Sequence, residues 1–110
     1  MHVDDLAKAC VFILGLEKKA YWNAVDGRMP FLNVGSGKDV QIIELAELIS
    51  EAVGFKGLIK YDNTMPNGMV RKLLNSSKVN ALGWKPLISL EEGIATTLNW
   101  YQLNKQSVRG

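Results

Sequence analysis

The sequence is short of several residue types, and each shortage excludes a class of protein. Its one cysteine, Cys10, cannot form an internal disulfide or a cysteine-rich metal site. Its one histidine, His2, stands beside Asp4 and Asp5, but a three-ligand metal site needs better-spaced partners, so a capped helix start is favoured. No apolar run is long enough to cross a bilayer, and a net charge of +2 is too small to favour nucleic acid or an anionic membrane.

What remains is the composition of an ordinary globular domain. Hydrophobic residues make up 47% of the 110 positions and charged residues 22%, which argues against a disordered chain. The length fits one domain with a modest core. An acidic, amphipathic stretch follows Met1, where a signal peptide would have a basic region and an apolar core. A cytoplasmic location is therefore expected.

Four segments carry apolar residues at helical spacing and predict helices. Capping signals mark two of their starts: Asp4 or Asp5 for the first, and the box formed by Ser89 and Glu92 for the last. In the first helix Cys10 lies within an apolar stripe, which favours a buried, inert thiol. The expected helices are roughly 4–19, with Lys18 and Lys19 at the far end of the first, then 42–53, 76–82 and a final one that begins near 90.

Two short segments, 31–34 and 58–62, predict strands on either side of a helix. The strand–helix–strand order favours parallel pairing with a right-handed crossover. Residues 20–30 are expected to form a loop that turns at Asp26-Gly27. The predicted fold class is therefore α/β, with about four helices and a short two-stranded parallel sheet.

The run Gly35-Ser36-Gly37-Lys38 resembles a phosphate loop but completes no nucleotide motif. A dinucleotide fingerprint needs a third glycine where Val40 stands, and a P-loop needs Ser or Thr where Asp39 stands. A structural turn with Gly37 at positive φ is the favoured interpretation.

Two further features admit a functional and a structural interpretation. Tyr101 and Lys105 share the spacing of a dehydrogenase Tyr–Lys pair, yet they lie near the carboxyl terminus, where a solvated helix end is favoured. Trp84 and Trp100 are expected in the core or at its rim. The adjacent cations Arg71 and Lys72, in a Pro/Gly loop, fit a phosphate grip and an ordinary surface pair equally well on chemistry alone.

The order of four blocks resembles one family more specifically than any single motif does. The blocks together resemble the carboxyl-terminal part of the GDP-L-fucose synthases, which are extended short-chain dehydrogenase/reductases. The N-x-G-[ST]-G element is shared by many sugar-nucleotide epimerases and dehydratases, whereas P-x-G-x-x-R-K-L followed by L-G-W is more specific. The blocks are HVDDLAKAC (2–10), NVGSGKDVQIIELAELISEAVGFKG (33–57), YDNTMPNGMVRKLLNSSKVNALGWKP (61–86) and SLEEGIATTLNWY (89–101).

The resemblance implies that this chain is one domain of a larger enzyme. In that family an amino-terminal Rossmann domain holds NADP and the catalytic Ser, Tyr and Lys, while the smaller carboxyl-terminal domain grips the GDP-sugar. Residues 1–110 would be that GDP-sugar-binding domain, with the Rossmann domain absent. The chain would then be inactive alone, with no catalytic, cofactor-binding or metal-binding residue, and with an exposed apolar face for docking. The parent would be an NADP-dependent homodimer that needs neither nucleic acid nor membrane.

The resemblance also assigns substrate-binding residues. The segment Pro66-Asn67-Gly68 aligns with a Pro-Asp-Gly substrate contact, and Asn67 keeps an acceptor but loses the charge. Arg71 and Lys72 match an Arg-Lys pair that faces the nucleotide diphosphate. The expected substrate-binding residues are therefore Asn67, Arg71 and Lys72. The alternatives are the substrate domain of another nucleotide-sugar epimerase or dehydratase, and a non-catalytic interaction module.

Overall fold

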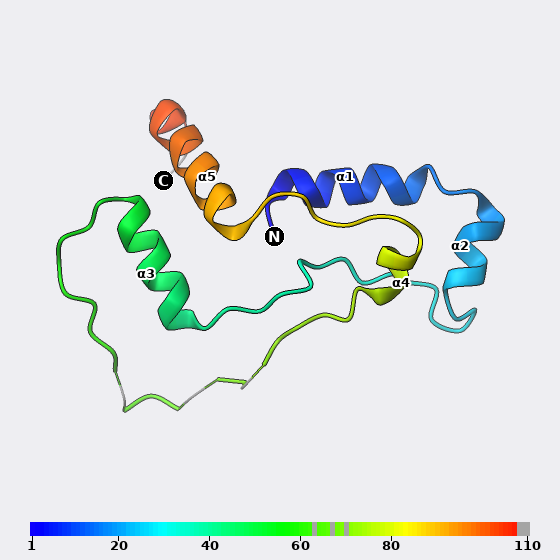
Figure 1. The fold of residues 1–110 in the computed structure, drawn as a ribbon, viewed down its shortest axis with the longest axis horizontal. Helices are drawn as coiled ribbons and strands as arrows, with labels where there is room; N and C mark the ends of the chain where they lie inside the picture. Colours follow the sequence, from blue (N-terminus) through cyan, green and yellow to red (C-terminus); the bar gives the residue numbers. More distant parts are fainter. Residues whose placement is uncertain (63, 67, 70, 108–110) are drawn as a thin grey trace. The chain divides into compact units, whose positions relative to one another are not determined.

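The computed structural model describes residues 1–62, 64–66, 68–69 and 71–107, and their regular structure is helical. Five α-helices follow one another along the chain (Figure 1). Within the described ranges no β-strand forms, and Asp26 and Met29 make an isolated antiparallel bridge. None of the described helices is long and apolar enough to cross a membrane. The helices are α1 (Val3–Leu14), α2 (Lys18–Ala24), α3 (Ile42–Ala52), α4 (Ser77–Ala81) and α5 (Leu90–Asn104).

The predicted two-stranded parallel sheet is wrong. Segments 31–34 and 58–62 have no regular structure. Their β-branched and aromatic residues favour strands, but a strand also needs a ladder partner, and neither segment has one among the described residues. The helix count differs as well, because α2 occupies part of the predicted loop. The aromatic pair Tyr21 and Trp22 meets edge to face in α2, with ring centroids 5.5 Å apart.

The chain divides into two compact units. Unit 1 comprises Met1–Asp39 and Leu73–Leu90, and unit 2 comprises Val40–Lys72 and Glu91–Gly110. Helices α1, α2 and α4 therefore belong to unit 1. Helix α3 and all of α5 after its first residue belong to unit 2.

Unit 1 is organised around a small apolar core. Ala9 of α1, Val79 of α4 and Trp84 just beyond α4 are buried, which confirms the core role predicted for Trp84. Phe12, Ile13 and Val34 pack against this cluster and are partly buried. The core thus joins α1 and α4 to the segment that leads into the glycine turn.

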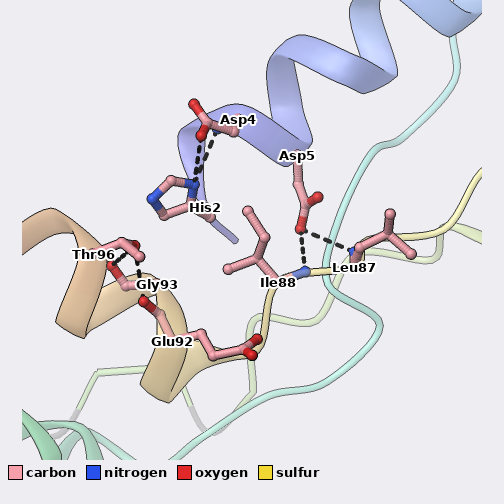
Figure 2. A network of polar contacts seen from close by, with 8 residues as sticks. All are labelled: His2, Asp4, Asp5, Leu87, Ile88, Glu92, Gly93 and Thr96. Atoms are coloured by element: carbon pink, nitrogen blue, oxygen red, sulfur yellow. Dashed lines mark hydrogen bonds and ion pairs between the residues drawn. The ribbon is translucent and has the colours of Figure 1, made fainter.

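A buried carboxylate ties the start of α1 to the chain before α5. Asp5 is 1% exposed, and one of its oxygens accepts hydrogen bonds from the backbone N–H groups of Leu87 and Ile88, at 3.1 and 2.9 Å (Figure 2). The Ile88 bond is the main cause that lowers the pKa of Asp5, against the opposing effect of desolvation. Charge-assisted bonds of this kind are stronger than neutral ones. Asp5 is therefore a long-range anchor.

The predicted cap of the first helix is corrected by this arrangement. His2 is the N-cap of α1, and its Nδ1 accepts from the backbone N–H of Asp4 at 3.2 Å. The prediction that Cys10 is buried is also wrong, because its side chain is exposed. The buried face of α1 is centred on Asp5 and Ala9, four residues apart, which leaves Cys10 a third of a turn away.

Unit 2 contains helices whose apolar side chains are at most half-buried among the residues described. Helix α3 begins with Glu44 accepting from the backbone N–H of Gln41 at 3.0 Å, and Gly54, at φ +67, follows its end. Ile42 is 79% exposed, and Trp100 on α5 is 58% exposed, contrary to the core role expected of it. The predicted exposed apolar surface is thus present along this unit.

Candidate functional site

The described residues of the predicted substrate loop form no helix or strand, and a side-chain turn marks its start. Asp62 accepts from the backbone N–H of Thr64 at 2.9 Å and from its hydroxyl at 2.6 Å. The hydroxyl bond is the main reason that the pKa of Asp62 is lowered. This is an Asx turn, in which a short carboxylate substitutes for a backbone acceptor. The loop therefore begins at a defined point.

A second Asx turn follows the loop. The side-chain oxygen of Asn75 accepts from the backbone N–H of Ser77 at 3.0 Å, where α4 begins. Asn75 thus serves a cap role at a helix start. Along the chain, the residues between these two turns include both predicted cations.

The cations lie at the end of an uncharged stretch. Arg71 and Lys72 are both exposed, and Asn67, the third predicted residue, lies outside the described residues. The ten residues 63–72 contain no Asp or Glu, so the charge of this loop is purely positive. Met65 and Met69 are 68% and 73% exposed and add apolar surface to the same loop. A guanidinium fork, an ammonium and a nearby apolar surface suit a ligand with phosphates and a flat ring.

The glycine turn is closed by its own contacts. A Cβ added at Gly35 would lie 3.1 Å from the Ser76 hydroxyl, so a side chain there would crowd that hydroxyl. The Ser36 hydroxyl donates to the Lys38 carbonyl at 2.8 Å and accepts from the Lys38 N–H at 3.4 Å. Gly37 has φ +72, as predicted. The arrangement is that of a structural turn.

The other candidate groups do not assemble into a site. Tyr101 is half-exposed on α5, and Lys105 is exposed directly after it. Among the described residues no group of three or more His, Cys, Asp or Glu is placed to hold a metal ion. His2 and Asp4 instead serve the start of α1, with His2 Nδ1 and Asp4 Oδ2 3.8 Å apart.

Sequence reasoning assigned Asp5 to the helix start and so missed its long-range role. One signal was available: Asp5 and Ala9 share a face of α1, so an acid stood on the buried face of an amphipathic helix. A carboxylate in that position needs partners from elsewhere in the chain. Its partners are the backbone N–H groups of Leu87 and Ile88, and no residue pattern in the sequence identifies which backbone groups they are.

Solved structures similar to this chain include two enzymes whose names refer to GDP-sugars. One similar structure is a GDP-D-glycero-L-gluco-heptose synthase of Campylobacter jejuni in the presence of NADPH, with a TM-score of 0.79, 30% identity, and coverage of 93% of this chain and 29% of that one. Another is the GDP-mannoheptose C4 reductase of the same organism with NADP bound, with a TM-score of 0.76 and 29% identity, over 93% of this chain and 30% of that one. The architecture is thus that of part of an extended short-chain dehydrogenase/reductase.

Curated relatives make the assignment more specific. GDP-L-fucose synthase 1 of Arabidopsis thaliana is 47% identical over 108 residues, which cover 94% of this chain and 29% of the relative. GDP-L-fucose synthase of Escherichia coli K12 is 38% identical over 110 residues, covering 100% of this chain and 34% of the relative. A putative UDP-glucose 4-epimerase of Methanocaldococcus jannaschii is 35% identical, over 97% of this chain and 32% of that protein. No family model matches.

The resemblance found in the sequence is therefore confirmed: the chain is a homologue of the carboxyl-terminal part of the GDP-L-fucose synthases. It spans about a third or less of the length of the relatives that it matches. Its matched relatives are enzymes of the oxidoreductase and epimerase classes.

Proposed function

We propose that this chain is the GDP-sugar-binding domain of an NADP-dependent GDP-L-fucose synthase. The parent enzyme would convert GDP-4-keto-6-deoxy-mannose to GDP-L-fucose by 3,5-epimerisation and 4-keto reduction. The observation that carries the proposal is the match along at least 94% of the chain to GDP-L-fucose synthases, which includes the cationic loop. The cations of that loop are compatible with a diphosphate ligand.

Each predicted residue has a defined task in this proposal. The Arg71 guanidinium presents paired N–H donors to two phosphate oxygens, and Lys72 adds a point charge. Asn67 offers a neutral acceptor and donor to the ribose or the base. NADP and the groups that move protons and hydride would belong to the amino-terminal Rossmann domain of a homodimeric parent, so the chain alone binds substrate and does not turn it over.

The test is titration calorimetry of the 110-residue chain with GDP-fucose. We expect weak binding with a measurable heat and a Kd in the millimolar range. The double substitution Arg71→Ala/Lys72→Ala should raise this Kd at least about tenfold, because each lost charge-assisted contact is worth about 1.5–3 kcal/mol. The matched control is Lys56→Ala/Lys60→Ala, which removes the same charge from exposed positions of the same unit. Equal losses in both double variants would reject the site.

The epimerase relative from Methanocaldococcus makes a second candidate function concrete. A UDP-sugar epimerase or dehydratase would use the same cationic loop on a different base. Parallel titrations with GDP-fucose and UDP-glucose distinguish the two candidate functions. In both, Arg71 and Lys72 would contact the shared diphosphate, so a difference in affinity would report on the rest of the ligand, the base included. Tighter binding of the uridine nucleotide would favour the alternative.

A cytoplasmic parent is part of the same proposal. The support is the single cysteine, which is exposed and unpaired in a chain with no disulfide, as is usual for proteins of reducing compartments. Separation of cell extracts, followed by detection of the full-length parent in the soluble cytoplasmic fraction, is the corresponding measurement.

A further inference from the structure

A hollow lies in unit 1 between one face of α1 and the chain that follows α4. Its volume is about 300 Å³, which is near the lower end of the range of small-molecule pockets. Asp5, Lys8 and Phe12 line it from α1, where spacings of three and four residues place them on one face. Residues of the segment 83–87 line it from the opposite side. All of these residues belong to unit 1, so the hollow lies within a single unit.

Backbone hydrogen bonds hold the segment 83–87 in place at both ends. The N–H of Trp84 donates to the Val79 carbonyl at 3.2 Å, which fixes the start of the segment to α4. Gly83, at φ +107, makes the turn between them, and a Cβ built there would meet nothing within 4 Å. The bond from the Leu87 N–H to Asp5 fixes the far end of the segment to α1. The hollow is therefore preformed, as ligand sites usually are.

The surface of the hollow is mainly apolar. Trp84 is 7% exposed and belongs to the core of unit 1, and the partly buried Phe12 packs against that core. Leu87 is 78% exposed. A flat apolar ring placed in the hollow would shield Phe12 and Leu87 from water, which is favourable.

Two lysines give the hollow an accessible positive charge. Lys8 lines it from α1 and Lys85 from the opposite side, and both are exposed. Neither of them forms an ion pair within the part of the chain that the structure describes. The one carboxylate that lines the hollow, Asp5, is 1% exposed, and one of its oxygens already accepts two backbone hydrogen bonds. A ligand that enters from solvent therefore meets the two ammonium groups before it meets this acid.

We propose that this hollow binds a small organic anion whose charge is attached to a flat apolar ring, in the class of aryl carboxylates and aryl phosphates. The ring lies against the apolar surface, and the anionic group lies between Lys8 and Lys85. Apolar burial supplies most of the affinity, and the exposed lysines supply the selectivity for an anion. The inference does not depend on the proposed function, because Arg71 and Lys72 belong to unit 2.

The test is an NMR titration of the isotope-labelled 110-residue chain with sodium benzoate at constant ionic strength. We expect saturable shifts of the Trp84 indole N–H and of the backbone amides of segment 83–87, with a Kd on the order of millimolar. Benzamide keeps the ring and loses the charge, so it should bind at least about threefold more weakly. Phenyl phosphate separates the two anion classes, since the tighter of the two anions identifies the preferred one.

The double substitution Lys8→Gln/Lys85→Gln should raise the Kd of benzoate about threefold or more and remove the preference for benzoate over benzamide. The matched control is Lys18→Gln/Lys19→Gln, which removes the same charge from exposed positions of the same unit and should leave the Kd unchanged.

Three results would each overturn the proposal: no saturable shift at Trp84, an equal Kd for benzoate and benzamide, or equal losses of affinity in the two double variants. The variant Arg71→Ala/Lys72→Ala should bind benzoate normally. A failure of GDP-sugar binding in unit 2 is therefore distinguishable from a failure of anion binding in unit 1.

Discussion

The two units of this chain are stabilised to very different degrees. Every apolar side chain that is buried among the described residues lies in unit 1, where Asp5 also provides a long-range anchor. Unit 2 has two amphipathic helices, yet Ile42 and Trp100 are more exposed than buried. A helix of 11 or 15 residues draws most of its stability from a packed face. Unit 1 therefore has a core, whereas the described residues of unit 2 show none.

Under the proposed function, this difference would separate a structural part from a binding part. The cationic loop that ends at Lys72 belongs to unit 2, whereas the glycine turn, which resembles a nucleotide loop, is packed into unit 1. Regions with few buried contacts have low local stability, and ligand-binding segments are commonly drawn from them. The effects of substitutions in the two units should therefore differ, both in the property that changes and in the size of the change.

The largest effect is expected from removing the indole of the unit 1 core. Trp84→Ala should lower the free energy of unfolding by about 3–5 kcal/mol, because it empties a large buried volume. Trp100→Ala, which truncates an exposed indole of unit 2, should change it by less than about 0.5 kcal/mol. Urea denaturation followed by circular dichroism measures both. Similar losses would show that the two units are equally packed.

The next largest effect is expected at the carboxylate anchor. Asp5→Ala leaves the N–H groups of Leu87 and Ile88 without their acceptor and should clearly lower the urea midpoint. Asp5→Asn retains an acceptor oxygen and should lose less. The control Asp4→Asn changes the same charge at an exposed neighbour and should be close to neutral. If Asp5→Asn is as damaging as Asp5→Ala, the charge itself matters more than the acceptor.

The same anchor predicts an acid-sensitive stability. The folded-state pKa of Asp5 is below its ordinary value, so its contribution is complete above the unfolded pKa of about 4 and is lost as pH falls through the folded value. The free energy of unfolding, measured from pH 7 down to pH 2.5, should therefore decline below about pH 4. Asp5→Asn should flatten this decline. If the decline in the free energy of unfolding is unchanged in this variant, other carboxylates cause it.

A smaller effect is expected at the glycine turn. Gly37 has φ +72 and open space around it, so Gly37→Ala should cost about 1 kcal/mol through backbone strain alone. Gly27 has equally open space without a positive φ, and Gly27→Ala should be neutral or slightly stabilising. Differential scanning calorimetry of the two variants measures how much of the loss of stability comes from the positive φ at position 37. Equal effects would remove the need for glycine at position 37.

The smallest effect is expected on the surface of unit 2. Ile42 is 79% exposed, so Ile42→Thr should change the free energy of unfolding by no more than about 0.5 kcal/mol. The measurement is again the urea midpoint. A loss of more than about 1 kcal/mol would mean that α3 buries this side chain in solution, and unit 2 would then have a core of its own.

The helices were predictable where local chemistry specifies them. The start of α1 and the bounds of α3 and α4 were placed closely, whereas the first predicted helix ran on to Lys19 and α1 ends at Leu14. The positive φ of Gly37 follows from its turn position. Helix α2 was missed because its seven residues show little periodicity and the turn signals that follow it favoured a loop. The two strands were overpredicted because β-propensity reports a side-chain environment and cannot supply a ladder partner.

The candidate site was likewise only partly predictable from the sequence. The sequence alone shows a loop at 63–72 that has no acidic residue and contains the cations Arg71 and Lys72. It also shows the resemblance that suggests a ligand for these cations. The assignment of these residues to a GDP-sugar stays a prediction. The closure of Gly35 by Ser76 joins residues 41 positions apart, and no local pattern records it.

The sequence by itself determined the four helical segments other than α2, the glycine turn and the relationship to GDP-L-fucose synthases, because each depends on residue order and local conformation. The tertiary structure alone decided which face of α1 is buried, that Asp5 anchors Leu87 and Ile88, and that Ser76 and Asn80 are buried without partners in the described chain. Those facts depend on contacts between distant residues. Such contacts are set by packing the whole chain, and neither propensity nor spacing encodes them locally.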